Sequence, residues 1–184
     1  MLIEKTEIPK LVELVNQGKA IFIPTNVASK KNGKEIRQRY TNKSECCNVA
    51  SIKQSNKWFC TKCRKPTKLR VIRFVGSSDK VLEYEKETEE DYLKNKALFK
   101  RLTKGLIPPY YIGWFFIRKS KHKFDYSNLI ELPQDLMTKY GYWDDDNCDF
   151  NVPIVLGHAY NKEQAGVIMV VFKDKPKIDL EKLY

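Results

Sequence analysis

The spacing of apolar residues predicts a helix and then a strand at the start of this chain. Apolar positions recur at helical spacing over residues 9–18, with a proline near the first turn and a glycine at the end. The apolar run 20–24 is typical of a buried strand. The next segment, 25–40, is polar and basic, and its stretch 29–34 is expected to be a loop.

A longer helix is predicted over residues 79–102. Acidic residues gather in its first half and basic residues in its second, which is the arrangement that the helix dipole favours. One face of this helix carries the residues that we expect to be buried, namely Val81, Tyr84, Thr88, Tyr92 and Phe99.

The second half of the chain predicts three further strands. The runs 111–118, 152–160 and 165–173 are rich in aromatic and β-branched residues, and a short helical segment lies between residues 125 and 141. Helices that flank a mixed sheet indicate an α/β or α+β fold. We therefore expect one domain over residues 1–184, with a small module inserted at 44–70.

The charge balance adds a candidate partner. The chain has 184 residues with 34 Lys and Arg against 23 Asp and Glu, a formal charge of +11. Such a surface attracts phosphate backbones, acidic proteins or anionic membranes, although it can also be merely solvated. There is no long apolar run and no signal-peptide pattern at the start, so a soluble, cytoplasmic protein without membrane contact is expected.

Four of the five cysteines lie close together in the predicted insertion. Cys46 and Cys47 are adjacent, and Cys60 and Cys63 form a Cys-x-x-Cys pair twelve residues later. This spacing predicts a closed, structural Zn²⁺ site of the zinc-ribbon type, with free thiols as the alternative. The fifth cysteine, Cys148, is expected to be an incidental thiol.

Acidic residues flank the second helical segment. Asp125 precedes it, and the run Asp144, Asp145 and Asp146 follows it. In an extended run Asp144 and Asp146 would share one face. Carboxylates in a basic protein suggest a Mg²⁺ site that faces a polyanion, whereas the alternative is a solvated acidic turn.

These residues resemble a known family. Three blocks follow one another in the order found in RusA-like Holliday junction resolvases, which are endodeoxyribonucleases of phages and prophages: Asp125-x-x-Asn128-Leu129, Asp135-Leu136 and Gly141-Tyr-Trp-x-Asp145-Asp146. Upstream, Ile23-Pro24-x-Asn26-x-x-Ser29-Lys30-Lys31-Asn32 and Lys80-x-x-x-Tyr84-Glu85-Lys86 are similar to the first strand, loop and helix of that family.

The resemblance implies a homodimer that binds four-way DNA junctions and cuts them with Mg²⁺ or Mn²⁺. The family's carboxylates correspond here to Asp125 and Asp146 as metal ligands, with Asp145 beside them. Two positions depart from the family pattern, because Ser127 replaces an aspartate and Glu131 replaces a lysine. Both lie one helical turn apart, so Glu131 is positioned to return the missing carboxylate, as an auxiliary acid.

Basic residues on both sides of the acidic motif are expected to contact DNA phosphates. They are Lys30, Lys31, Lys34, Arg118, Lys119, Lys121 and Lys123. Two alternatives to an active nuclease stay open at this stage. One is a catalytically degenerate DNA-binding protein on the same fold, and the other is a zinc-ribbon adaptor whose partner is another protein.

Overall fold

The computed structural model describes residues 8–29 and 34–176 of the chain. The chain divides into two compact units. We call residues 1–33 and 79–184 the core unit, and Lys34–Ser78 the insert. The insert thus extends beyond residues 44–70 on both sides.

The core unit contains a mixed sheet of four strands. Its strand order is β1 (Ile21–Pro24), β9 (Gly166–Phe172), β7 (Tyr110–Arg118) and β8 (Asn151–Tyr160). Strands β7 and β8 are parallel, whereas β9 runs antiparallel to both of its neighbours, β1 and β7. The strands predicted in the second half of the chain are all present.

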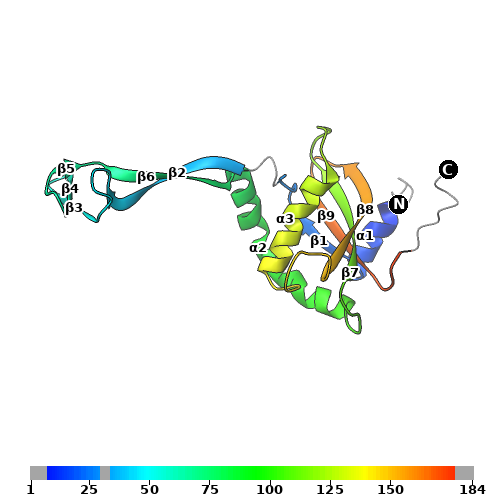
Figure 1. Cartoon of the computed structure of the whole chain (residues 1–184). Helices are drawn as coiled ribbons and strands as arrows, with labels where there is room; N and C mark the ends of the chain where they lie inside the picture. The colour runs from blue at the N-terminus through cyan, green and yellow to red at the C-terminus, as the bar shows by residue number, and fades with distance from the viewer. Residues whose placement is uncertain (1–7, 30–33, 177–184) are drawn as a thin grey trace, which may run out of the picture. The chain divides into compact units, whose positions relative to one another are not determined.

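Helices cover both faces of this sheet. They are α1 (Ile8–Asn16), α2 (Asp79–Leu102) and α3 (Tyr126–Lys139). Figure 1 shows α2 and α3 together on one face and α1 on the other. The structure therefore has an α+β fold, a mixed sheet flanked by helices, as predicted.

Strand β7 supplies side chains to two separate apolar layers. Trp114 and Phe116 pack with buried residues of α2 and α3, whereas Phe115 packs with Leu11 of α1. Successive side chains of a strand point to opposite faces, which explains the alternation. A strand buried on both faces reads as the continuous apolar run seen in the sequence.

Helix α3 connects the two parallel strands. It begins at Tyr126 and continues through the buried Pro133 to Lys139. The proline does not break the helix, so Ser127 and Glu131 lie one turn apart, as expected from their spacing. The crossover places the first turn of α3 beside the carboxyl ends of β7 and β8, where α/β sheets commonly bind ligands.

The insert is built from strands alone. Strand β2 (Lys34–Ser44) pairs antiparallel with β6 (Leu69–Ser77), and a small sheet joins β3 (Ser51–Gln54), β4 (Lys57–Cys60) and β5 (Pro66–Thr67). The loop expected over residues 29–34 lies mostly outside the described residues, and strand β2 begins at its last residue, Lys34. No strand was predicted over 34–44 from the sequence, because a strand whose two faces meet solvent has no clear apolar period.

No helix among the described residues is long and apolar enough to cross a membrane.

Candidate functional site

The four clustered cysteines meet in the insert, as predicted. Their Sγ atoms all lie within 4.8 Å of one another, and those of Cys46 and Cys63 are 3.7 Å apart. Cys60 is buried, whereas Cys46 is exposed. Cys148 belongs to the core unit and is exposed, outside this cluster.

Two similar turns hold these cysteines. The N–H of Asn48 donates to the carbonyl oxygen of Ser44 over 3.0 Å, and the N–H of Arg64 donates to that of Cys60 over 2.9 Å. Asn48 and Arg64 both have a left-handed backbone, with φ of 55° and 58°. Ser44 in the first turn therefore occupies the position that Cys60 has in the second turn. The first turn still provides two thiols, because Cys46 lies inside it, next to Cys47.

The protonation states of these thiols differ. Hydrogen bonds from the backbone N–H of Cys63 and from the Ser44 hydroxyl lower the pKa of Cys60 to about 6. Hydrogen bonds with Cys60 and Cys46 raise the pKa of Cys47 to about 12. The Cys60 thiolate is thus favoured while the Cys47 thiol resists ionisation, and a bound cation would remove that resistance, because metal ligation requires the thiolate.

The cluster fits a structural Zn²⁺ ion. Zn–S bonds of about 2.3 Å in a tetrahedron separate the sulfur atoms by about 3.8 Å, which matches the 3.7 Å between Cys46 and Cys63. Small sheets of this size need additional stabilisation in water. The four cysteines could therefore bind a zinc ion that holds the end of the insert together.

The positive charge of the protein is concentrated in the insert. The insert, Lys34–Ser78, contains 12 of the 34 Lys and Arg residues but only two of the 23 Asp and Glu residues. Its formal charge is therefore +10. The core unit keeps 22 basic and 21 acidic residues, so it is almost neutral. The net charge of +11 does not by itself show this division, because it does not say where the charged residues lie.

A cleft lies in the core unit where β7 and β8 end and α3 begins. Asp125 occupies the position before the first residue of α3, and its Oδ2 accepts a hydrogen bond of 3.0 Å from Nδ2 of Asn128 instead of capping the helix. Three residues that were predicted to contact phosphates line the same cleft, and His122 lies there with them: Arg118, Lys121 and Lys123.

Arg118 is fixed within this cleft. Its Nη1 donates to the carbonyl oxygen of Val27 over 2.8 Å, and its guanidinium carbon lies 5.1 Å from the centre of the Phe124 ring. Nε of Arg118 is buried without a partner among the described residues. Partial burial lowers the pKa of Arg118, although a guanidinium stays charged at any physiological pH.

His158 is a cleft residue that the sequence did not single out. Its Nδ1 lies 2.7 Å from the Tyr126 hydroxyl and its Nε2 lies 3.2 Å from the Tyr160 hydroxyl. The parallel pairing of Phe116 with His158 carries the ring to the end of the sheet. Strand register is a tertiary property, so residue spacing offers no signal for this placement.

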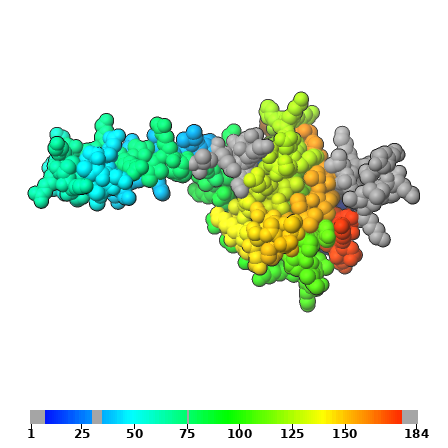
Figure 2. All heavy atoms as spheres, in the orientation of Figure 1, coloured from blue at the N-terminus to red at the C-terminus, as the bar shows by residue number. Residues whose placement is uncertain are grey.

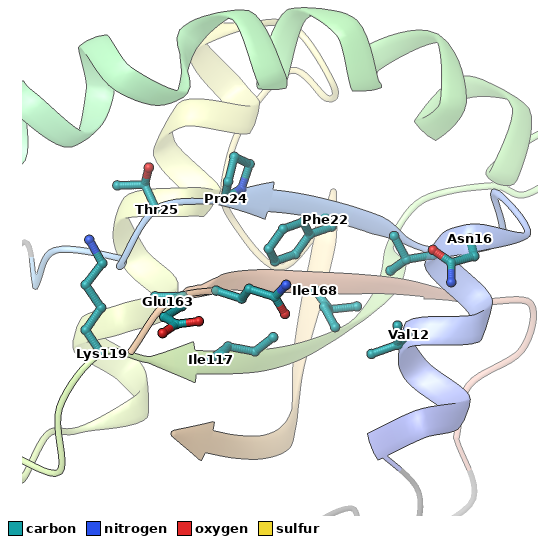
Figure 3. Close-up of a pocket in the computed structure, with 12 residues that line it drawn as sticks. Val12, Asn16, Phe22, Pro24, Thr25, Ile117, Lys119, Glu163 and Ile168 are labelled. Carbon is teal, nitrogen blue, oxygen red and sulfur yellow. The ribbon is translucent and has the colours of Figure 1, made fainter. Parts of the chain in front are cut away.

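Lys119 does not line the cleft that contains Arg118, Lys121 and Lys123. It lines a mainly apolar pocket between α1 and the sheet, in which Glu163 also lies (Figure 3). The remaining predicted contacts are distributed differently. Lys30 and Lys31 lie outside the described residues, and Lys34 begins β2 in the insert.

Asp146 forms a close acidic pair with Asp135 of α3. A hydrogen bond with Asp135 raises the pKa of Asp146, and partial burial and the negative charges of Asp135 and Asp145 act in the same direction. The loop that follows α3 lies on the surface of the core unit (Figure 2). Asp135 was part of the family resemblance but was not chosen as a site residue, although it follows Glu131 by one helical turn.

Asp145 has a structural role in this loop. Its Oδ1 accepts from the backbone N–H of Asp146 over 2.8 Å, and its Oδ2 accepts from Nδ2 of Asn147 over 2.7 Å. The run is bent and is not a strand, so the expected extended face shared by Asp144 and Asp146 is absent. Asp146 interacts with Asp135 of α3.

Asp125 and Asp146 occupy separate positions along α3. Asp146 contacts Asp135, which lies ten residues beyond Asp125, and a helical rise of 1.5 Å per residue puts about 15 Å between these backbone positions. The two carboxylates thus have different partners along this helix, Asn128 for Asp125 and Asp135 for Asp146. Glu131 lies between them on α3 and is half-buried.

Among the described residues, the cysteines are the sole cluster of three or more metal-binding side chains. Two carboxylates are nevertheless sufficient for Mg²⁺, which commonly uses one or two of them and completes its shell with water and substrate phosphate. The pair Asp135 and Asp146 fits that requirement, with Glu131 one turn away.

Searches of protein families and of curated proteins found no family model and no protein that matches this chain.

Proposed function

We propose that this protein is a Mg²⁺-dependent endodeoxyribonuclease that cuts four-way junctions or other branched DNA. The observation that carries the proposal is the paired carboxyl groups of Asp135 and Asp146, within a segment that resembles the catalytic region of RusA-like resolvases. Two close carboxylates repel each other when both are ionised, and a divalent cation relieves that repulsion.

In this proposal Asp135 and Asp146 hold the metal, and Glu131 is an auxiliary acid. The ion would polarise the phosphate and help to ionise an attacking water. Asp145 keeps the loop in the conformation that presents Asp146, through its hydrogen bonds with Asp146 and Asn147. Mn²⁺ prefers similar oxygen ligands, so it should support the same reaction.

The cleft around Asp125 has a separate role. Arg118, Lys121 and Lys123 would bind the phosphate backbone there, and the fixed guanidinium of Arg118 would contribute the most directional contact. The carboxylate of Asp125 would accept hydrogen bonds from the nucleic acid, and the amide of Asn128 would donate them. These contacts would orient the nucleic-acid strand. This division of roles agrees with the separation of Asp125 from Asp146 along α3.

A homodimer is part of the proposal, since symmetrical cleavage of a four-way junction requires two active sites. Light scattering coupled to gel filtration tests this directly. A mass of twice the 21.6 kDa of one chain is expected, and a monomer in both the free and the DNA-bound state would contradict it.

The experiment that tests the activity compares a mobile four-way junction with a linear duplex of the same sequence. We expect nicks at symmetrical positions in the junction, in Mg²⁺ or Mn²⁺, and none without a divalent metal. Equal cleavage of the linear duplex would reject branch specificity, and the absence of nicks in either metal would reject the nuclease.

A second candidate function is binding of branched DNA without cleavage. The replacement of the family's aspartate by Ser127 favours it, because this residue offers the metal a weaker ligand than a carboxylate. Tight junction binding that does not change in Asp146→Asn, together with no nicks, would support this second function.

A further inference from the structure

The paired strands β2 and β6 of the insert form a two-stranded ribbon whose faces both meet solvent. Ile36 and Tyr40 on β2 are 79% and 70% exposed, and Phe74 on β6 is 42% exposed. Apolar side chains on an uncovered ribbon contribute little to its stability, since a two-stranded sheet is marginal in water. Exposed apolar groups among charges are typical of interaction surfaces.

Arginines alternate with these apolar groups on each face of the ribbon. Arg37 pairs with Phe74 and Arg39 with Ile72, and directly opposite residues of an antiparallel pair share a face. The guanidinium of Arg39 lies 5.7 Å from the centre of the Phe74 ring, which restrains its position.

The opposite face has the same character. Gln38 pairs with Arg73, and Tyr40 pairs with Val71. All four of these side chains are exposed. Each face thus offers a guanidinium together with an aromatic or aliphatic group, and one face adds the amide of Gln38.

The charge of the insert identifies the class of partner. A formal charge of +10 within Lys34–Ser78 is far more than structural needs explain, and four bound thiolates with one zinc ion would still leave it strongly positive. Lysines distributed over the rest of the insert extend this charge beyond the ribbon: Lys43, Lys53, Lys57, Lys62, Lys65 and Lys68. The complementary partner is a polyanion.

The shape of the ribbon favours double-stranded DNA over double-stranded RNA as this polyanion. The major groove of B-form DNA is about 12 Å wide and admits a two-stranded ribbon, whereas that of A-form RNA is too narrow for side chains to read. The regular pairing from Lys34 to Tyr40 covers seven residues, or about 23 Å at 3.3 Å per residue. That length matches roughly two-thirds of a turn of B-DNA.

We propose that the β2–β6 ribbon is a duplex-DNA-binding element that enters the major groove, with Arg39 and Arg73 directed at base edges and the neighbouring lysines at phosphates. Guanidinium and amide groups are the side-chain groups that read guanine and adenine in this groove. The exposed Tyr40, Ile72 and Phe74 would contact thymine methyl groups and sugars. This site belongs to the insert and does not depend on cleavage by the core unit.

The other end of the insert would hold the ribbon in place. Nη1 of Arg70 donates to Oδ1 of Asn48 over 2.6 Å, and Asn48 directly follows Cys47. The cysteine cluster is thereby connected to β6. Zinc binding and DNA binding are therefore expected to be coupled.

The test uses the full-length, zinc-loaded chain and a 20-base-pair duplex, with binding followed by fluorescence anisotropy and no Mg²⁺ present. The variant Arg39→Gln/Arg73→Gln removes one guanidinium from each face. Its control, Lys100→Gln/Lys104→Gln, removes the same charge from exposed positions of the core unit. Zinc content is measured for each variant, so that a fold defect is recognised.

We expect the arginine variant to bind at least about tenfold more weakly, whereas the control should change by less than about twofold. The slope of log K against log salt should change little, because in this proposal the lysines neutralise the phosphates and the arginines contact base edges. The wild type should also protect guanine N7 from methylation in the major groove. A zinc-replete arginine variant with unchanged affinity would overturn the proposal.

A charge-conserving variant separates groove reading from simple attraction. Arg39→Lys/Arg73→Lys should keep the salt slope yet lose the methylation protection, because lysine lacks the guanidinium fork. Retained protection in this variant would contradict the proposed contacts with bases. Equal affinity for double-stranded RNA of the same sequence would likewise reject the major groove of DNA as the target.

Discussion

The sulfur atoms of Cys46 and Cys63 lie 3.7 Å apart although the two residues are 17 positions apart in the sequence. The two turns that carry the cysteines have the same backbone form, with Asn48 and Arg64 in equivalent left-handed positions. In the first turn Ser44 takes the place of a cysteine, and Cys46 compensates for it. The unusual adjacent pair is thus explained by the geometry of the turn.

The first prediction concerns the stoichiometry of zinc. We expect about one zinc ion per chain, with a large loss in Cys60→Ser and Cys63→Ser, because structural zinc needs four ligands. Metal analysis of the purified variants measures this. Cys148→Ser is the matched control and should keep its zinc, since Cys148 lies outside the cluster. Full zinc content in Cys60→Ser would show that the cluster is not the binding site.

The second prediction concerns removal of the metal. A chelator should unfold the cysteine-containing part of the insert, because small sheets such as β3–β4–β5 depend on the ion. The core unit has its own apolar layers and should keep its cooperative melting transition. Calorimetry with and without chelator tests this. A core transition that shifts together with the loss of zinc would contradict independent units.

Much of the fold could be predicted from the sequence. The helix predicted over 79–102 coincides with α2, and the apolar run at 111–118 coincides with β7 to within one residue. The buried face of α2 imposes a helical period on its residues, whereas β7 is buried on both faces and is recognised by its continuous apolar run. Strand β2 has no such face and is held by pairing with β6, so the sequence of this polar and basic segment contains no strand signal.

The candidate sites show a similar division. The cysteine cluster was predictable because short spacing limits where thiols can go. The pairing of Asp146 with Asp135 was not, since it depends on how the loop after α3 folds back onto the helix. His158 reaches the cleft through parallel strand register, which no local pattern encodes.

The third prediction concerns the pH dependence of stability. Contact with Asp135 raises the pKa of Asp146 in the folded protein, so folding favours its protonated form when no divalent ion is present. This contribution is complete below the ordinary aspartate pKa of about 4 and is lost as pH rises through the raised value. Asp146→Asn should therefore melt about 1–2 °C higher than wild type near neutral pH.

The difference between Asp146→Asn and wild type should shrink as the pH is lowered toward about 4. Added Mg²⁺ should stabilise the wild type more than the variant. Differential scanning fluorimetry over a pH series provides the measurement, with Asp144→Asn as the control. A variant that melts lower than wild type at neutral pH without metal would refute the repulsion between Asp135 and Asp146.

The fourth prediction concerns the packing of strand β9. A Cβ atom at Gly166 would lie 2.5 Å from the backbone oxygen of Ile23 and would also clash with the Phe22 ring. Backbone atoms of a paired strand cannot yield, so Gly166→Ala should cost about 1–3 kcal/mol. Gly76→Ala is the control, because its Cβ would meet the flexible Arg37 side chain. Equal denaturation midpoints for both variants would contradict this packing.

The central claim is that Asp135 and Asp146 form the metal site of a DNA-cutting enzyme. The most direct measurement is the single-turnover rate of junction nicking in Mg²⁺ for wild type, Asp135→Asn, Asp146→Asn and Asp144→Asn. We predict a loss of at least about 100-fold in the first two variants, with junction binding retained and Asp144→Asn close to wild type. Nicking at the wild-type rate by Asp135→Asn and Asp146→Asn would contradict the claim.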